Sequence, residues 1–400
     1  MSAMEPTPAT PGTGDPNAAT SPLEADLASA QEVQSLDSAA GAHAYGEIMQ
    51  SPLADEASCR VKEQAIYALT HIYADEKAFD SILAVLSVAN ALFELIPKAK
   101  TAKIVRTILE IVSQVPDAID LQVQLCNQIV EWCVFRRGAP AAPAHARTHA
   151  HTHTHDTRRT SHPPPLLASP PPPSPPRCVS QKRSFLRQRV QTRLVVLLFK
   201  QHKYQDALSL CTSLLRELKK LDDKSMLVET HLAEAHVHHA LRNLPKAKAA
   251  STAARSASNA IYVVPLLQAE LDKMSGTLQC EEGDYTTSYS YFLEAFEAFN
   301  AQAEPANDRD AGPSGNSYRT AALCLKYMML CQILAGTESD VHAIVAGKHG
   351  IRYAGPDLEA MLAIAAAAKD RSLKAFDAAI AKFGSVLSDD MLIKHHLAKL

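Results

Sequence analysis

A short turn motif recurs in the second half of the chain at an almost constant spacing. The motif is centred near Tyr204, returns at Leu244 and returns again at Tyr285, so that the spacings are 40 and 41 residues. Each copy separates two segments whose apolar residues recur with the period of an α-helix. Repetition at this period is typical of stacked helical hairpins, which form an α-solenoid. Chains of this kind usually bind or scaffold other proteins.

The three copies share a tetratricopeptide-like pattern of large and small residues. The clearest copy reads Gly283-Asp-Tyr285-Thr-Thr-Ser288 and is followed by Phe292 and Ala295. A small residue lets one helix approach its partner to about 8–10 Å, and a large residue fills the gap beside the turn. The corresponding residues are Tyr204, Ala207, Cys211 and Leu214 in the first copy, and Leu244, Ala247, Ser251 and Ala254 in the second.

The remaining sequence also predicts helices. The chain is rich in Ala and Leu, has 14 glycines among 400 residues, and contains long segments of helical periodicity. The predicted fold is therefore all-α, a right-handed α-solenoid of tetratricopeptide-like hairpins. Two helices are predicted between Leu23 and Met49, and others at about 56–75, 77–95, 97–115, 117–133, 184–200, 207–218, 225–241, 245–261, 265–281, 285–300, 318–334, 339–345, 357–367, 373–383 and from 389 onward, with a loop at 301–315.

Two segments have the composition of unfolded chain. Residues 1–22 are mostly Pro, Thr, Ala, Gly and Ser, and we expect a disordered tail. Residues 134–181 are a low-complexity His/Pro insert with alternating His-Thr at 148–155 and proline runs at 163–165 and 170–173. Two interpretations of this insert stay open. The alternating histidines could bind a metal ion. The proline runs could be ligands for an SH3 or WW domain. We favour the hypothesis of a retained intron, since a CA-dinucleotide repeat encodes His-Thr, and spliced transcripts that join residues near 133 and 182 would support it.

Four histidines are the strongest candidate for chemistry. His231, His236, His238 and His239 fall on one predicted helix with Glu234. A zinc protease needs the spacing H-E-x-x-H, which this helix lacks, so we interpret these histidines as packed or solvated. No P-loop, G-x-G-x-x-G, G-x-S-x-G or cysteine-nucleophile signature occurs. The sequence therefore predicts no enzyme, no catalytic residues, no cofactor and no metal site.

The distribution of charged residues limits the kinds of partner that we expect, and the spacing of the cysteines predicts their burial. Lys100, Lys103 and Arg106 follow one another at i, i+3 and i+6, and could meet an acidic partner surface or could form a solvated face. Nucleic acid is disfavoured, because this stripe is short, lacks interleaved aromatic residues and belongs to a chain of net charge −3. Cysteines seven residues apart share one helix face, and we predict buried thiols at Cys126 and Cys133 and at Cys324 and Cys331.

Targeting signals are also missing from the sequence. No apolar run reaches the roughly 18 residues of a membrane-spanning helix. The first forty residues lack the charged region and apolar core of a signal peptide, and they carry acidic residues that transit peptides usually lack. Scattered cysteines fit a reducing compartment. We expect a protein of the cytoplasm and nucleus with no membrane partner.

Several long segments together identify a family. They are Val61-Lys-Glu-Gln-Ala65, Val130-Glu-Trp-Cys133, Leu214-Leu-Arg-Glu-Leu-Lys-Lys-Leu-Asp-Asp-Lys224, Ala240-Leu-Arg-Asn-Leu-Pro-Lys-Ala247, Ser290-Tyr-Phe-Leu-Glu-Ala-Phe-Glu297, Leu325-Lys-Tyr-Met-Met-Leu-Cys331 and Arg352-Tyr-Ala-Gly355. These segments resemble a proteasome lid subunit of the PCI family, and the similarity covers most of 55–133 and 182–400. The resemblance implies an α-solenoid at 23–133 that continues at 182–284, then the helical part of a PCI module at 285–400, with the winged helix missing and 134–181 as an extra insert.

The resemblance also implies a role. The implied role is a non-catalytic scaffold in the lid of the 19S regulatory particle. Such a subunit supports lid assembly and bridges the regulatory particle to the 20S core for ubiquitin-dependent protein degradation. The implied partners are other lid PCI subunits, a 20S core α-subunit and an ATPase subunit of the regulatory particle. Two alternatives stay open: a related PCI subunit of the COP9 signalosome, and a free tetratricopeptide-type adaptor.

Overall fold

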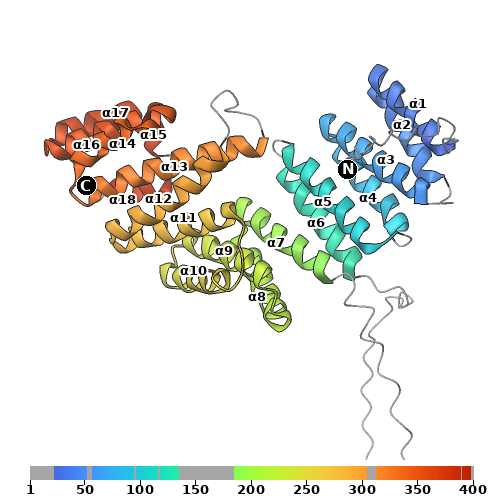
Figure 1. The fold of residues 1–400 in the computed structure, drawn as a ribbon, viewed down its shortest axis with the longest axis horizontal. Helices are drawn as coiled ribbons and strands as arrows, with labels where there is room; N and C mark the ends of the chain where they lie inside the picture. The colour runs from blue at the N-terminus through green and yellow to red at the C-terminus, as the bar shows by residue number, and fades with distance from the viewer. Residues whose placement is uncertain are drawn as a thin grey trace, which may run out of the picture. The chain divides into compact units, whose positions relative to one another are not determined.

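The protein is built from α-helices wherever its structure is defined. The computed structural model describes residues 22–51, 56–93, 96–115, 118–134, 184–303, 312–388 and 390–397, and every regular element in these ranges is helical (Figure 1). The predicted all-α class is therefore confirmed. The chain forms two compact units, Met1–Leu125 (unit 1) and Cys126–Leu400 (unit 2). The predicted domain bounds stay predictions, and the His/Pro insert lies outside the described residues.

Unit 1 stacks its helices in the manner of a solenoid. Each of the first three helices packs against the next one, and α3 also contacts α1 and α5, an arrangement typical of stacked helical hairpins. The buried Lys62 holds α2 and α3 together, because its Nζ donates hydrogen bonds to the carbonyl oxygens of Met49 and Ser51 at the end of α2. The helices are α1 (Pro22–Leu36), α2 (Ser38–Gln50), α3 (Glu56–Asp75), α4 (Phe79–Phe93), α5 (Lys98–Gln114) and the start of α6 (Ile119–Val134).

The helical periodicity of 77–95 predicts a buried face formed by Ile82, Val85, Val88, Leu92 and Leu95, and the structure shows that this prediction is wrong at Val88. Val88 is 48 % exposed, whereas Leu86 and Ala89 are buried. Lys77, predicted as the first helical residue, has φ +56 and belongs to the turn. Measured from the buried Ile82, Leu86 and Ala89 lie at i+4 and i+7 on the inner face, and Val88 at i+6 points away from it.

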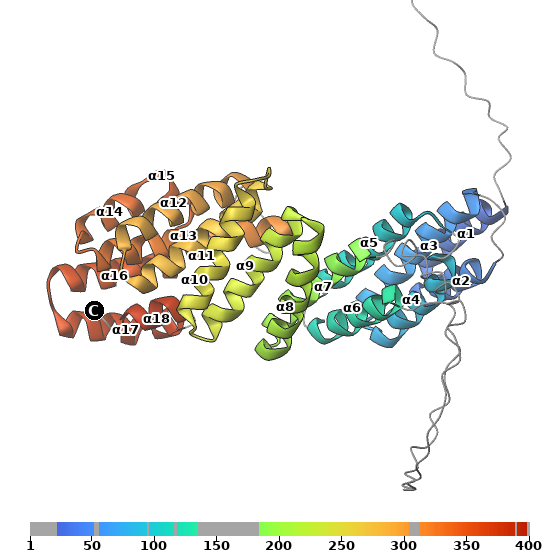
Figure 2. The same cartoon turned by 90° about the horizontal axis from the view of Figure 1, so that it is seen from below.

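Unit 2 continues with three hairpins and a C-terminal bundle. The hairpins pair α7 with α8, α9 with α10 and α11 with α12, and α9 also contacts α7 and α11 (Figure 2). The bundle packs α13 against α12, α14 and α16. The helices are α7 (Ser184–Lys200), α8 (Tyr204–Leu221), α9 (Lys224–Ala240), α10 (Leu244–Ser258), α11 (Pro265–Glu282), α12 (Tyr285–Gln302), α13 (Gly312–Leu334), α14 (Glu338–Ala346), α15 (Lys348–Arg352), α16 (Pro356–Lys369), α17 (Leu373–Ser388) and α18 (Met391–Leu397).

The recurring turn motif ends one helix and starts the next with the same backbone geometry in all three copies. Tyr204, Leu244 and Tyr285 are the first residues of α8, α10 and α12. In each turn, the residue two positions earlier has a left-handed backbone, with φ between 58° and 90°. The amide of the next residue donates to a carbonyl five positions earlier, which is the pattern of a Schellman motif. These bonds are Lys203 to Leu198, Asn243 to His238 and Asp284 to Gln279, each 2.9–3.0 Å long.

The same turn also occurs outside the three predicted copies. Lys77, Gly336 and Arg371 have positive φ values two residues before α4, α14 and α17. Their following amides bond to Tyr73, Gln332 and Ala367. Four of these six turns have a residue other than glycine at the left-handed position, so a search of the sequence for glycine alone does not find them.

The large and small residues of the motif differ in burial. Ala207, Ala247 and Ser288 are completely buried, as expected for close helix contacts. Tyr204 and Tyr285 are only half-buried. The Tyr204 ring lies 6.0 Å from the Phe199 ring, and its hydroxyl lies 2.8 Å from Nδ1 of the exposed His202. The small residue is thus the stronger packing constraint.

The C-terminal bundle departs from three predictions. The loop predicted at 301–315 is shorter, because α12 reaches Gln302 and α13 already begins at Gly312; residues 304–311 lie outside the described ranges. Pro313 tolerates this helical start, since the first turn needs no amide donor. Helix α15 was not predicted, and α17 runs past Phe383, whose backbone is not helical.

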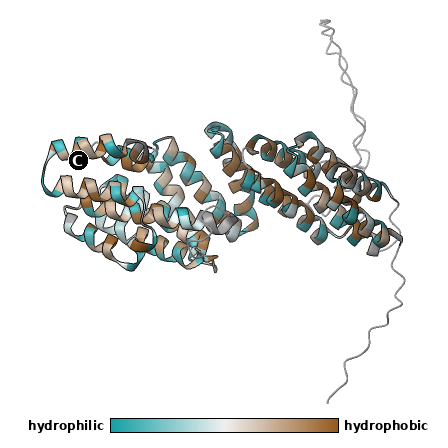
Figure 3. Cartoon of the chain, turned by 90° about the horizontal axis from the view of Figure 1, so that it is seen from above, coloured by the Kyte–Doolittle hydropathy of each residue, from teal (hydrophilic) through white to brown (hydrophobic). Residues whose placement is uncertain are grey.

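The main core of unit 2 surrounds Phe292 of α12. Figure 3 shows apolar and polar residues on different faces of the helices. Phe292 is completely buried, and its ring lies 5.0 Å from the ring of Tyr327 on α13. Gly276 of α11 lies directly against this ring, because a Cβ added there would be 2.9 Å from Phe292 Cε1. Helices α11 and α12 can approach this closely only because position 276 has no side chain.

We expect Gly276→Ala to lower the free energy of unfolding of unit 2 by about 1–3 kcal/mol, because the added methyl must displace a buried ring. Gly46→Ala in α2 is the control, since nothing lies within 4 Å of its added Cβ. That helical substitution should stabilise unit 1 by about 0.5–1 kcal/mol. Urea denaturation measures both, and a Gly276→Ala variant as stable as the wild type would contradict the close approach.

Candidate functional site

The four predicted histidines all lie on α9, but they have separate surroundings. His231 is buried, and its Nδ1 lies 2.9 Å from Oε2 of Glu234. The His236 ring packs 6.1 Å from that of Phe199. Burial lowers the pKa values of His238 and His239. Among the described residues, no group of three or more His, Cys, Asp or Glu side chains has the arrangement of a metal site.

His236 should make the stability of unit 2 depend on pH. Burial, assisted by the positive charge of Lys273, lowers the pKa of His236 to about 4. As the pH falls from about 6.5 towards 4, this histidine binds a proton in the unfolded chain but stays neutral in the folded chain. The free energy of unfolding therefore decreases over this pH range. We expect His236→Gln to flatten this decline. Urea midpoints at pH 7.5 and 5, compared between wild type and variant, measure it, and equal declines would contradict the assignment.

Among the described residues, a group of charged and titratable side chains surrounds Glu281 near the end of α11. The Glu281 side chain is 2 % exposed, and Arg242 Nη1 lies 2.8 Å from its Oε1. His239 Nε2 lies 3.6 Å from the same oxygen. From α18, His395 Nε2 lies 3.4 Å and His396 Nε2 lies 4.0 Å from Oε2. We call Glu281, Arg242, His239, His395 and His396 the Glu281 cluster.

The Glu281 cluster joins three elements that are distant in sequence. His239 comes from α9, Arg242 from the turn after it, and the two adjacent histidines from α18. The ring of the completely buried His396 also lies edge-on to Tyr285 at 6.3 Å. One buried carboxylate, paired with a guanidinium and facing imidazoles, satisfies the requirement that a buried charge be paired. The cluster therefore positions α18 against the third hairpin.

The start of α18 is held by a second set of polar contacts. Asp390 accepts a hydrogen bond of 2.7 Å from the Tyr327 hydroxyl and one of 2.9 Å from the Leu392 amide. Burial and the Asp390 carboxylate raise the pKa of Tyr327 well above its usual value. The neighbouring Lys326 is buried and donates to Asp357 Oδ1 and to the Val386 carbonyl. Two adjacent residues of α13 thus connect α16, α17 and α18.

The predicted basic stripe is partly engaged within unit 1. Lys103 Nζ lies 3.1 Å from Glu63 Oε1, and the same carboxylate accepts a hydrogen bond from the Tyr67 hydroxyl. Burial and the bond to Glu63 raise the pKa of Tyr67 to about 12. Arg106 is exposed. Contact of the stripe with an acidic partner stays a prediction.

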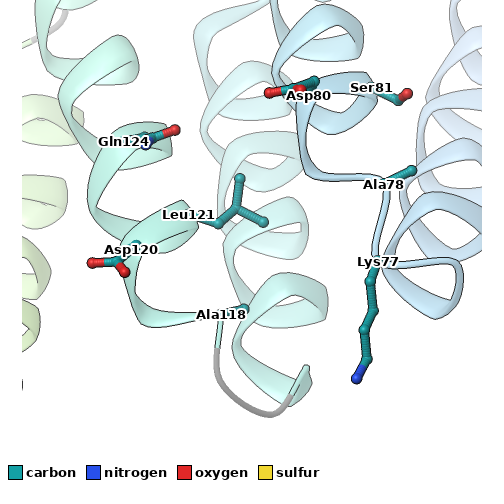
Figure 4. Close-up of a pocket in the computed structure, with 8 residues that line it drawn as sticks. All are labelled: Lys77, Ala78, Asp80, Ser81, Ala118, Asp120, Leu121 and Gln124. Atoms are coloured by element: carbon teal, nitrogen blue, oxygen red, sulfur yellow. The ribbon is translucent and has the colours of Figure 1, made fainter.

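Unit 1 has a groove of about 570 Å³ between the first turns of α4 and α6 (Figure 4). Asp80 and Asp120, from the first turns of α4 and α6, contribute its acidic groups. Figure 4 shows Lys77 extending away from both aspartates, so these groups do not converge as an acid–base pair. The groove is lined by Lys77, Ala78, Asp80, Ser81, Ala118, Asp120, Leu121 and Gln124.

Three of the four cysteines that were predicted to be buried are buried in the structure. Cys126, Cys324 and Cys331 are buried, whereas Cys133 is half-buried. Burial raises the pKa of Cys126 and of Cys324 to about 12. A thiol with such a pKa is a poor nucleophile at neutral pH, so these two residues serve packing. The thiol of Cys331 lies 3.3 Å from the Ser288 hydroxyl.

Comparisons with known proteins agree on one family. The family model described as the 26S proteasome regulatory subunit RPN6 N-terminal domain matches residues 23–138. The 26S proteasome non-ATPase regulatory subunit 11 homolog of Arabidopsis thaliana is 40 % identical over 354 residues, which cover 88 % of this chain and 70 % of that protein. The probable 26S proteasome regulatory subunit rpn6 of Schizosaccharomyces pombe is 34 % identical over 357 residues, 89 % of this chain and 71 % of the relative. In the part of the chain that the structure describes, each helix is too short or too polar to span a lipid bilayer.

Proposed function

Because this chain belongs to the family of 26S proteasome regulatory subunit 11, also called Rpn6, we propose that it is a scaffold subunit of the 26S proteasome regulatory particle. In this role it supports assembly of the lid and connects the regulatory particle to the 20S core for ubiquitin-dependent protein degradation. The observation that carries this proposal is 40 % identity to a subunit 11 homolog over 88 % of the chain. Because this similarity extends over most of the chain, it includes the residues of extended surfaces and not only those of a single motif.

The architecture supports a scaffold rather than an enzyme. A solenoid presents a long surface on rigid helices, and each hairpin contacts only its neighbours. In the described residues, the polar clusters join helix to helix: Lys62 holds α2, Glu281 holds α18, and Lys326 holds α16 and α17. These side chains serve the fold, and the protein acts through its surfaces.

The partners and the location follow from the same family. We propose contacts with other PCI subunits of the lid, a 20S core α-subunit and an ATPase subunit of the regulatory particle. We also propose that the protein works in the cytoplasm and nucleus, where such particles would meet their substrates. Neither nucleic acid nor membrane belongs to the proposed partners.

Affinity purification of the tagged full chain from the cells that express it tests the proposal. Quantitative mass spectrometry should recover subunits of the regulatory particle and of the 20S core in near-equal amounts. Recovery of COP9 signalosome subunits would instead favour the related PCI complex, and recovery of chaperones or isolated clients would favour a free adaptor. Protease or deubiquitinase activity of the isolated chain would contradict the scaffold role.

A further inference from the structure

The connection between α10 and α11 is unlike the six Schellman turns. Those turns are short and contain a residue with positive φ, whereas residues 259–264 form a longer connection without one. The connection reads Asn-Ala-Ile-Tyr-Val-Val and leads into Pro265 and Leu266. No charged residue occurs between Arg255 and Glu270. A loop of this composition is unusual, because surface connections are normally polar.

The side chains of this connection alternate as in a β-strand. Ile261 packs against the apolar core of the second and third hairpins, and Val263 is half-buried. Tyr262 is 88 % exposed and Val264 is 61 % exposed. This period of two places a Tyr and a Val together on the outside, while their neighbours anchor the segment. The exposed pair makes no evident contribution to the stability of unit 2.

The backbone of the same segment indicates what kind of molecule would cover it. Val264 has extended angles, φ −61° and ψ 136°. Within the described residues, the amides of Tyr262, Val263 and Val264 donate no hydrogen bond to a backbone carbonyl. An extended segment with free amides and alternating apolar side chains has the properties of a sheet edge, which an extended peptide can join by main-chain hydrogen bonds.

We propose that residues 261–264 are a docking site for an uncharged, extended segment of a neighbouring protein, which pairs with this backbone and encloses the Tyr262 ring. A tyrosine suits such a site, because it buries a large area at small entropic cost and its hydroxyl can stay hydrated. Because residues 256–269 carry no charge, a charged side chain of the partner would be buried here without an opposite charge from this segment, and that cost favours an uncharged partner segment. The inference does not depend on which complex the chain joins.

The test places a photo-crosslinking amino acid at position 262 of the full chain, in the cells that express it. We expect one discrete adduct with a second protein, identified by mass spectrometry. Hydrogen exchange of the amides of 262–264 should slow at least about tenfold in the purified complex relative to the free chain. Tyr262→Asp should remove this slowing without changing the melting temperature. Leu373, which is 75 % exposed at the start of α17, is the matched control for both the crosslinker and the Asp substitution.

The outcomes separate this inference from the proposed function. An adduct with a proteasome subunit, together with slowed exchange, supports both. An adduct with a protein outside the proteasome, together with slowed exchange, supports the docking site and contradicts the proposed function. No adduct, an adduct with a second copy of this chain, or unchanged exchange at 262–264 would overturn the docking site, whereas the subunits recovered with the wild type decide the proposed function separately.

Discussion

Phe292→Ala should lower the free energy of unfolding of unit 2 by about 3–5 kcal/mol, the usual loss when a buried phenylalanine is truncated. The ring is completely buried between Gly276 of α11 and Tyr327 of α13. Its removal leaves a cavity where three helices meet, and the backbone of α11 cannot collapse into it without breaking the hairpin contacts. Hydrogen bonding does not compensate, because the site is apolar.

Urea denaturation followed by circular dichroism measures this loss, with Phe185→Ala as the control. Phe185 lies in the first turn of α7 and is exposed, so its truncation should change the free energy of unfolding by less than about 0.5 kcal/mol. Equal effects of the two substitutions would show that Phe292 is not the centre of this core.

Arg242→Met should lower the stability of unit 2 by about 2–3 kcal/mol, because it leaves the buried Glu281 carboxylate without its closest cation. This loss is smaller than the roughly 3–5 kcal/mol usually observed when one partner of a buried ion pair is removed. The reason is that the Arg242 side chain is itself partly exposed, and that His239 and His395 remain near the carboxylate. The double variant with Glu281→Gln should recover part of the loss, since it removes the unpaired charge.

Arg371→Met is a matched control for this experiment. Arg371 occupies the same left-handed position in the turn between α16 and α17, with φ +44° against +58° for Arg242. It is exposed, and no ion pair to it occurs among the described residues. The same substitution should therefore change stability by less than about 0.5 kcal/mol. Similar losses at positions 242 and 371 would assign the effect to the turn backbone rather than to Glu281.

Local features of the fold could be predicted from the sequence. The register of Tyr204, Leu244 and Tyr285 is recoverable because a helix start, a left-handed residue and a small residue three positions later are all close in sequence. The error at Val88 came from counting steps of three from Ile82 and Val85, which drifts off the buried face because an α-helix has 3.6 residues per turn. Helix α15 has only five residues and too little periodicity to be detected.

The contacts around Glu281 could not be predicted in this way. Glu281 is one of many acidic residues, and only the packing of α9, α11 and α18 brings His239 and His395 to it. A hydrophobic pattern indicates which face of each helix is buried, but not which charged residues meet across distant helices. The predicted helix at 245–261 also concealed the connection at 259–264, because Ile261 continues the apolar periodicity beyond the true end of α10 at Ser258.

The most direct test of the scaffold account is the distribution of proteasome particles after depletion of this chain. Native gels stained by hydrolysis of a fluorogenic peptide separate the 26S particle from the free 20S core. The account predicts that depletion lowers the 26S band and raises the free-core band, and that re-expression of the full chain restores both. An unchanged ratio of the two bands after complete depletion would contradict it.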